Sequence, residues 1–133
     1  MKNPERTIAE IRLLSTHFGP VCFDPDDPSV VLIEDFPLPE GYNRSSCEVV
    51  IALGEHYPEL PPQDWYLSKG LRKNGRKSSH YFEEGFGDKE YCNQGYAWYS
   101  FHIKTWRPNP WSMLGGDNLL SAANGFHKAL KTD

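Results

Sequence analysis

The order of apolar segments constrains this chain most, because extended stretches lie between two amphipathic ones. Residues 30–33, 47–53 and 64–67 are short runs rich in β-branched and aromatic residues, which is typical of strands. The flanking segments 4–18 and about 117–131 instead carry apolar residues at helical spacing. Strands that follow one another, with helices only at the two ends, favour an α+β domain with an antiparallel sheet.

The first predicted helix ends at a clear signal, since Gly19 suits a C-terminal cap and the proline after it cannot continue a helix. Its apolar stripe consists of Ile8, Ile11, Leu14 and Phe18. We expect Arg6, Glu10 and Thr16 to face away from that stripe. Residues 22–29 contain two prolines and are predicted to be a turn-rich connection.

A fourth strand is predicted at residues 96–103, where aromatic side chains alternate. Period-two alternation places Trp98, Ser100 and His102 on one face of that strand. Residues 68–93 are polar and glycine-rich and show no periodicity, so we expect a long loop there. Loops of this length in small domains are usually functional or mobile.

Composition narrows the class further. With 133 residues, of which 38% are apolar and 14% aromatic, the chain fits one domain, residues 1–133, with a real core. The net charge of −4 argues against a nucleic-acid surface. There is no apolar run of membrane-spanning length and no signal-peptide pattern, so we expect no membrane contact and a cytoplasmic location. Three cysteines without metal-ligand spacing predict no disulfide framework, no metal and no cofactor.

Two proline motifs carry a resemblance to a known family. Tyr-Pro-Glu-Leu-Pro-Pro at residues 57–62 follows the second strand, and Trp-Arg-Pro at residues 106–108 precedes the last helix. In this order and context they resemble the ubiquitin-conjugating (UBC-like) fold. Residues 35–43 and 98–102 further resemble the diverged bacterial branch of that fold. The resemblance covers about residues 5–130.

The resemblance implies a fold, a function and partners. The fold would be an N-terminal helix, an antiparallel four-stranded meander, a long active-site loop and a C-terminal helix. Members of this branch are found beside ubiquitin-like proteins, an activating-enzyme homologue and a JAB-type peptidase. The implied reaction is that of an acyl carrier, which accepts the C-terminus of a ubiquitin-like protein from an activating enzyme and transfers it to a target.

The catalytic residue of the family cannot be carried over by position. The eukaryotic enzymes have a His-Pro-Asn triplet shortly before the nucleophilic cysteine, and that cysteine lies eight residues before the tryptophan of the Trp-x-Pro motif. Here His80 is followed by Tyr81, and the residue eight places before Trp106 is Trp98, which cannot act as a nucleophile.

Two residues remain as candidate nucleophiles. Ser100 lies six residues before Trp106, and His102, two residues further on, shares its strand face. Because residues i and i+2 of a strand lie about 6.5–7 Å apart, a hydrogen bond between them requires favourable rotamers or a bridging water. Such a pair would support an oxyester intermediate. Cys92, in the long loop, would instead form a thioester, and the loop could bring it against His102.

The remaining polar residues have plainer interpretations. Asn93 and Asn109 could donate a hydrogen bond to an oxyanion, although turn roles are commoner. Arg107 is expected to support the proline corner. Cys22 and Cys47 are expected to be small buried residues beside strands, and His17 and His56 to lie on the surface. A basic run in the long loop is expected to be solvated or to meet an acidic partner: Lys69, Arg72, Lys73, Arg76 and Lys77.

Three functions therefore stand as hypotheses from the sequence. The first is an enzyme, a ubiquitin-conjugating-like acyl carrier that uses Ser100 or Cys92 with His102. The second is a non-catalytic binding module of the same fold, which the missing His-Pro-Asn triplet favours. The third, an unrelated small-ligand domain, has only the aromatic content behind it.

Overall fold

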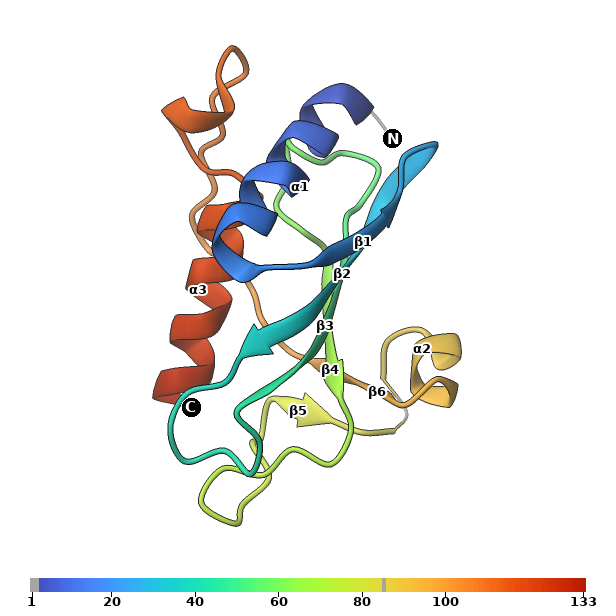
Figure 1. Ribbon diagram of the computed structural model, residues 1–133, viewed down its shortest axis with the longest axis vertical. Helices are drawn as coiled ribbons and strands as arrows, with labels where there is room; N and C mark the ends of the chain where they lie inside the picture. Colours follow the sequence, from blue (N-terminus) through green and yellow to red (C-terminus); the bar gives the residue numbers. More distant parts are fainter. Residues whose placement is uncertain (1–2, 85) are drawn as a thin grey trace.

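Six antiparallel strands form one sheet, and a helix from each end of the chain packs on one of its faces (Figure 1). The computed structural model describes residues 3–84 and 86–133, so residue 85 of the predicted loop lies outside the described part. The strand order is β1-β2-β3-β4-β6-β5. The elements are α1 (Pro4–Phe18), β1 (Val21–Asp24), β2 (Asp27–Pro37), β3 (Ser46–Ala52), β4 (Asp64–Ser68), β5 (Tyr81–Phe82), α2 (Lys89–Asn93), β6 (Tyr96–Tyr99), a 3₁₀ turn (Met113–Gly115) and α3 (Leu119–Thr132).

The predicted class is confirmed: the fold is α+β, with an antiparallel sheet between terminal helices and a UBC-like element order. The sheet is wider than the four predicted strands because β1 and β5 were not expected. β1 and the start of β2 occupy most of residues 22–29, which were predicted to be a turn-rich connection, and the two strands form a hairpin in which Val21 pairs with Ile33. β5 has only two residues and pairs with β6, Tyr81 opposite Tyr99. A strand this short depends on its partner and leaves no periodic pattern in the sequence.

Local contacts cap both ends of the first helix. The Asn3 side chain caps α1 by accepting a hydrogen bond from the Arg6 backbone N–H at 3.2 Å, and Gly19 ends the helix with a φ of 78°. Ile11 and Leu14 are fully buried, as their spacing predicted. The expected outward orientation of Glu10 is wrong, because its side chain is also completely buried.

Glu10 is buried because three donors satisfy its carboxylate. The Tyr57 hydroxyl donates to Oε1 at 2.5 Å, and the backbone N–H of Leu119, the first residue of α3, donates to the same oxygen at 2.7 Å. The Arg6 guanidinium contacts Oε2 at 3.0 Å. A buried carboxylate is tolerated only with such partners. Glu10 therefore joins α1 to α3 and to the proline corner at residues 57–62.

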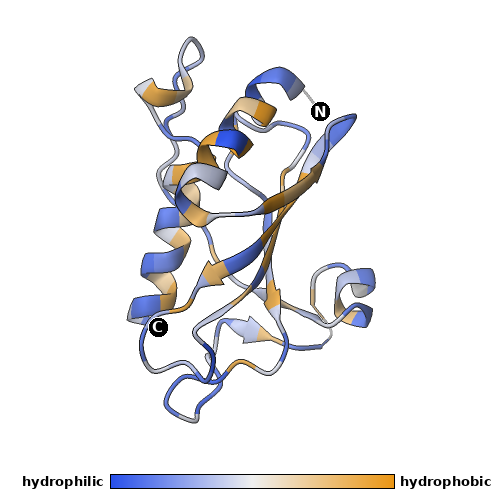
Figure 2. Cartoon of the chain, viewed as in Figure 1, coloured by the Kyte–Doolittle hydropathy of each residue, from blue (hydrophilic) through white to orange (hydrophobic). Residues whose placement is uncertain are grey.

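The two proline motifs meet in space. The Trp106 indole N–H donates to the carbonyl of Pro58 at 2.7 Å, and the rings of Tyr57 and Trp106 lie 6.0 Å apart. The core next to them is aromatic: Trp65 of β4 stacks on Phe126 of α3, with ring centroids 4.5 Å apart. Figure 2 shows apolar residues along the middle strands and on parts of α1 and α3, with mostly polar residues in the connection between β4 and β5.

The segment 68–93 was predicted to be an irregular loop but contains both β5 and α2. The α2 helix is a single short turn that Asp88 caps by accepting from the backbone N–H of Glu90 at 2.9 Å. It lies on the sheet face opposite α1 and α3 (Figure 1), where the rings of Tyr66 and Tyr91 are 4.5 Å apart. Aromatic contacts therefore hold this segment, which is otherwise polar.

Candidate functional site

Ser100 and His102 contact each other directly, just beyond the end of β6. The Ser100 Oγ lies 3.2 Å from His102 Nε2, which is hydrogen-bonding distance. The Ser100 backbone N–H donates to the carbonyl of His80 at 2.7 Å, so the main chain of this candidate nucleophile is held in place. Ser100 is half-buried and His102 is exposed. In the tautomer that carries its proton on Nδ1, the His102 ring would accept the hydroxyl proton at Nε2, and the hydroxyl then has a base in place.

The predicted strand at 96–103 is shorter in the structure because β6 ends at Tyr99. The last pair with β4 is Trp65 opposite Tyr99. The Phe101 ring packs edge-on against Trp65, with ring centroids 5.4 Å apart. After Tyr99 the chain therefore packs on the hydrophobic core and no longer pairs with β4. Beyond Tyr99 the chain is no longer a strand. In this segment the Ser100 hydroxyl and the His102 imidazole contact each other directly.

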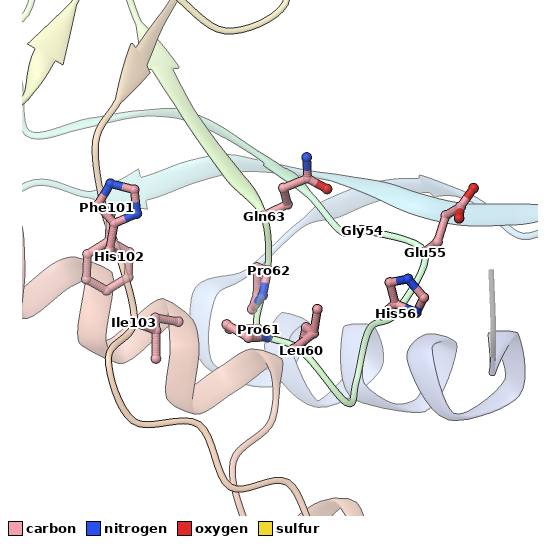
Figure 3. Close-up of a pocket in the computed structure, with 10 residues that line it drawn as sticks. All are labelled: Gly54, Glu55, His56, Leu60, Pro61, Pro62, Gln63, Phe101, His102 and Ile103. Carbon is pink, nitrogen blue, oxygen red and sulfur yellow. The ribbon is translucent and has the colours of Figure 1, made fainter.

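A pocket of about 340 Å³ opens beside this pair, between residues 54–63 and residues 101–103 (Figure 3). Its apolar lining comes from Leu60, Pro61, Pro62, Phe101 and Ile103. Glu55, His56, Gln63 and His102 supply its polar groups. A second pocket of about 310 Å³ is lined by residues 101–106 together with residues of α3 and Asp117. His102 therefore lines both pockets.

The position expected for the His-Pro-Asn triplet of the family is structural in this chain. His80 precedes β5, and the next residue, Tyr81, is buried in the sheet. The Tyr81 hydroxyl donates to the carbonyl of Ser68 at 2.5 Å, and burial raises the pKa of Tyr81 to about 12. A phenol held in this way supplies neither an amide donor nor a base to the site.

Comparison with known families decides the relationship. The model of the family described as prokaryotic E2 family E matches residues 21–133. The chain belongs to this family. Its membership confirms the resemblance to bacterial UBC-like proteins and places the chain in the conjugating-enzyme-like class. Searches among curated proteins and among solved structures give no match. The α1 helix precedes the matched residues.

Cys92, the other candidate nucleophile of this E2-family chain, is not brought to His102. It lies on α2, half-buried, and its Sγ donates to the carbonyl of Phe86 at 3.6 Å. The α2 helix lies before β6 in the chain, whereas Ser100 lies directly after it. The four residues of β6 span about 13 Å, and this length lies between α2 and Ser100. Within the described residues, Cys92 has no recorded contact with Ser100 or His102.

The other two cysteines differ from each other. Cys47 is buried, as expected, and desolvation by burial raises the pKa of its thiol to about 11. Cys22 is exposed, which contradicts the expected burial, because the edge strand β1 turns it outward. Its Sγ donates to Glu34 Oε1 at 3.3 Å, and this hydrogen bond is the main cause that raises the pKa of the thiol.

The two asparagines do not reach the Ser100 site in the structure. Asn109 accepts hydrogen bonds from the backbone N–H groups of Trp111 at 2.8 Å and Ser112 at 3.1 Å, which is a turn role. Asn93 ends α2, on the Cys92 side. The Arg107 backbone N–H donates to Asp117 Oδ2 at 2.8 Å, in line with a structural position.

Part of the basic run has partners inside the chain. Arg72 forms an ion pair with Glu83 at 2.9 Å, and Lys77 lies 3.8 Å from the same carboxylate. Lys73 Nζ donates to the carbonyls of Leu130 and Lys131 at 3.2 and 2.8 Å, at the C-terminal end of α3. Cations stabilise that end of a helix. Lys73 therefore joins the loop to α3, whereas Arg72 and Lys77 bind a carboxylate of the same loop.

The sequence interpretation missed the residues from other segments that line the pocket beside His102. His56 was expected to lie on the surface; it is exposed but lines the pocket together with Glu55 and Gln63. Their only sequence signal is that they flank the Tyr-Pro-x-x-Pro-Pro turn. Among the described residues no group of histidines, cysteines and carboxylates is placed to hold a metal ion. No helix in that part of the chain is long and apolar enough to cross a bilayer.

Proposed function

We propose that this E2-family chain is an acyl carrier, with Ser100 as the nucleophile and His102 as its general base. The hydroxyl would accept the C-terminus of a ubiquitin-like protein from an activating-enzyme-like protein and pass it to a target. The observation that carries this proposal is the 3.2 Å contact between Ser100 Oγ and His102 Nε2, together with the pocket beside the proline corner that His102 lines. A JAB-type peptidase completes the set of partners that the family resemblance implies.

Loading follows from this geometry in one balanced step. Ser100 Oγ attacks the acyl carbon of the activated C-terminus, His102 Nε2 takes the hydroxyl proton, and the thiolate of the activating enzyme leaves. The product is an oxyester on Ser100. The imidazolium proton passes to the released thiolate. In the second step, an acceptor nucleophile on the target attacks that ester, neutral His102 takes the acceptor's proton, and the Ser100 oxygen leaves with that proton from the imidazolium.

The oxyanion that forms in both steps needs a hydrogen-bond donor. Within the described residues, the backbone N–H groups of Phe101, His102 and Ile103 have no recorded acceptor. They follow the nucleophile directly, and all three residues line the first pocket. Main-chain donors adjacent to Ser100 therefore support the proposal in place of the asparagine that the family triplet would supply.

Cys92 is the alternative nucleophile. Its thiol is intrinsically the better nucleophile, but no base contacts it in the described structure, and its recorded hydrogen bond goes to a backbone carbonyl. A thioester on Cys92 would have to form on α2, away from His102.

A non-catalytic module that holds a ubiquitin-like partner is the second candidate function. The observation that favours it is the replacement of the family triplet by β5, with Tyr81 buried in the sheet. The same loading reaction separates the two functions, because a binding module forms a complex but no covalent adduct.

The test is incubation with the activating-enzyme-like and ubiquitin-like proteins of the same organism and ATP, followed by intact mass spectrometry. The proposal predicts an ATP-dependent mass increase of one ubiquitin-like protein minus water, which Ser100→Ala abolishes and Cys92→Ala leaves in place. An adduct lost only in Cys92→Ala would move the reaction to Cys92. Complex formation without an adduct would favour the binding module.

A further inference from the structure

A carboxylate lies on the same sheet face as the proposed nucleophile. Trp98 and Ser100 are two residues apart, so regular alternation would place them on the face opposite Tyr99. The Trp98 indole N–H donates to Asp64 Oδ1 at 3.1 Å. This bond reaches across from β6 to the first residue of β4, and it fixes the Asp64 carboxylate on that same face.

The strand register ends one step before Asp64 and Ser100. Its last pairs are Tyr66 opposite Trp98 and Trp65 opposite Tyr99, where β6 ends. Continuing the register by one step would place Asp64 opposite Ser100. Side chains opposite each other in an antiparallel pair have Cβ atoms about 4.5–5.5 Å apart. Asp64 is half-buried, so solvent screens its charge less than that of a fully exposed carboxylate.

A fixed negative charge near Ser100 would assist the proposed reaction. When His102 takes the hydroxyl proton, its imidazole becomes a cation, and a positioned carboxylate stabilises that cation in the transition state. The segment from residue 91 to residue 116 contains no aspartate or glutamate. A carboxylate for His102 must therefore come from another part of the chain.

The other carboxylates near His102 are less suited to this task. Asp117 lines the second pocket, but its two oxygens already accept from the Arg107 backbone N–H at 2.8 Å and the Ser121 hydroxyl at 3.1 Å. Glu55 is exposed at the rim of the first pocket. Asp64 is held by Trp98, and its second oxygen, Oδ2, has no recorded partner among the described residues.

We propose that Asp64 is a positioning residue for the Ser100–His102 pair, held in place by the Trp98 indole. It has no recorded ion pair with His102 in the described structure, so it acts across the Ser100 side chain, through space or through a bridging water. This inference rests on the proposed function, because it assigns a residue to the same nucleophile. A unit charge within several ångströms of the imidazolium in a partly solvated site changes a rate by about tenfold.

A small acyl donor tests the inference without the protein partners. With p-nitrophenyl acetate, Ser100 Oγ attacks the acetyl carbon, His102 takes the proton and p-nitrophenolate leaves, so that acetyl-Ser100 remains. Absorbance follows the release, and peptide mass spectrometry locates the acetyl group. We expect Asp64→Asn to lower the maximal acetylation rate about tenfold with an unchanged half-saturating ester concentration. Asp64→Glu should restore most of the rate, because the charge returns.

Two further variants separate this role from a structural one. Trp98→Phe keeps an aromatic ring against Phe86 but removes the donor that holds Asp64, so an intermediate loss of rate is expected. Glu48→Gln is the matched control: Glu48 is also half-buried, but it lies towards the far end of β3, next to Ser68. It should react at the rate of the unaltered chain.

The outcomes distinguish this inference from the proposed function. If the unaltered chain acetylates Ser100 and Asp64→Asn does so equally fast, the inference about Asp64 is wrong and the proposed function stands. An equal loss in Glu48→Gln would likewise refute it, because any lost carboxylate would then suffice. If the unaltered chain does not acetylate Ser100 at all, the nucleophile assignment fails, and the inference fails with it.

Discussion

The buried carboxylate of Glu10 offers the clearest test of how this fold is held together. Replacing Tyr57 with phenylalanine removes one of its three donors while the ring stays in place. A hydrogen bond to a charged group contributes about 1.5–3 kcal/mol to the free energy of unfolding. Glu10→Ala is more severe, because it leaves Arg6 and the Leu119 N–H without their partner and opens a cavity. Breaking a buried pair in this way costs about 3–5 kcal/mol.

These energies translate into measurable shifts of the melting temperature. At about 2.1 cal/mol/K per residue, the unfolding entropy of a 133-residue chain is about 0.28 kcal/mol/K. A loss of about 2 kcal/mol in Tyr57→Phe therefore lowers Tm by about 7 °C, and a loss of about 4 kcal/mol in Glu10→Ala lowers it by about 14 °C. Differential scanning calorimetry measures both values directly.

Glu5→Gln is the matched control, since Glu5 is an exposed carboxylate in the first turn of the same helix. Its effect should stay within about 0.5 kcal/mol. Because Tyr57 and Glu10 touch, the double variant should lose less stability than the two single losses added together. A Tm change below about 2 °C in Tyr57→Phe, or full additivity in the double variant, would refute the assignment of Glu10 as the junction of α1, α3 and the proline corner.

Two further predictions concern thiols and tryptophans. In the folded protein at pH 8, iodoacetamide should modify Cys22 but spare Cys47, because Cys47 is buried and its pKa of about 11 keeps it protonated below that pH; modification of Cys47 as fast as in the denatured chain would contradict this. Trp106→Phe should lower the free energy of unfolding by about 1 kcal/mol, because the hydrogen bond to the Pro58 carbonyl is lost. Trp111→Ala is the control and should change it by no more than about 0.5 kcal/mol, because Trp111 is 93% exposed. Equal losses of the two variants in urea unfolding would show that the bond to Pro58 contributes nothing.

Sequence reasoning succeeded where the signals are local. The C-terminal end of α1 follows from Gly19 and the proline after it, which act within one turn of the helix end. The buried middle strands follow from their own β-branched and aromatic residues. By contrast, β5 exists only through its pairing with β6, and the burial of Glu10 depends on Tyr57, 47 residues away. No periodicity in a single segment reports such distant partners.

The residues of the candidate site also differ in whether a local pattern in the sequence could identify them. Ser100 and His102 are visible in the sequence because they lie two residues apart in one segment. His56 is not, since it lines the pocket with His102 only through the turn before β4, and the role proposed for Asp64 likewise depends on the pairing of β4 with β6. Cys92 and His102 lie only ten residues apart, which suggested that the loop could bring them together. In the structure β6 lies between them, and the sequence spacing did not predict this separation.

The chemical nature of the adduct tests the central claim most directly. The chain is loaded with the ubiquitin-like protein by its activating enzyme and ATP, then treated with a reducing thiol or with strong base before intact mass spectrometry. We expect an oxyester on Ser100, which resists the thiol and is cleaved by base, because an alkoxide is a poorer leaving group than a thiolate. Ser100→Cys should convert it into a thiol-sensitive adduct, and His102→Ala should slow loading by about 10²–10⁴-fold. A thiol-sensitive adduct on the unaltered chain that persists in Ser100→Ala would contradict the account.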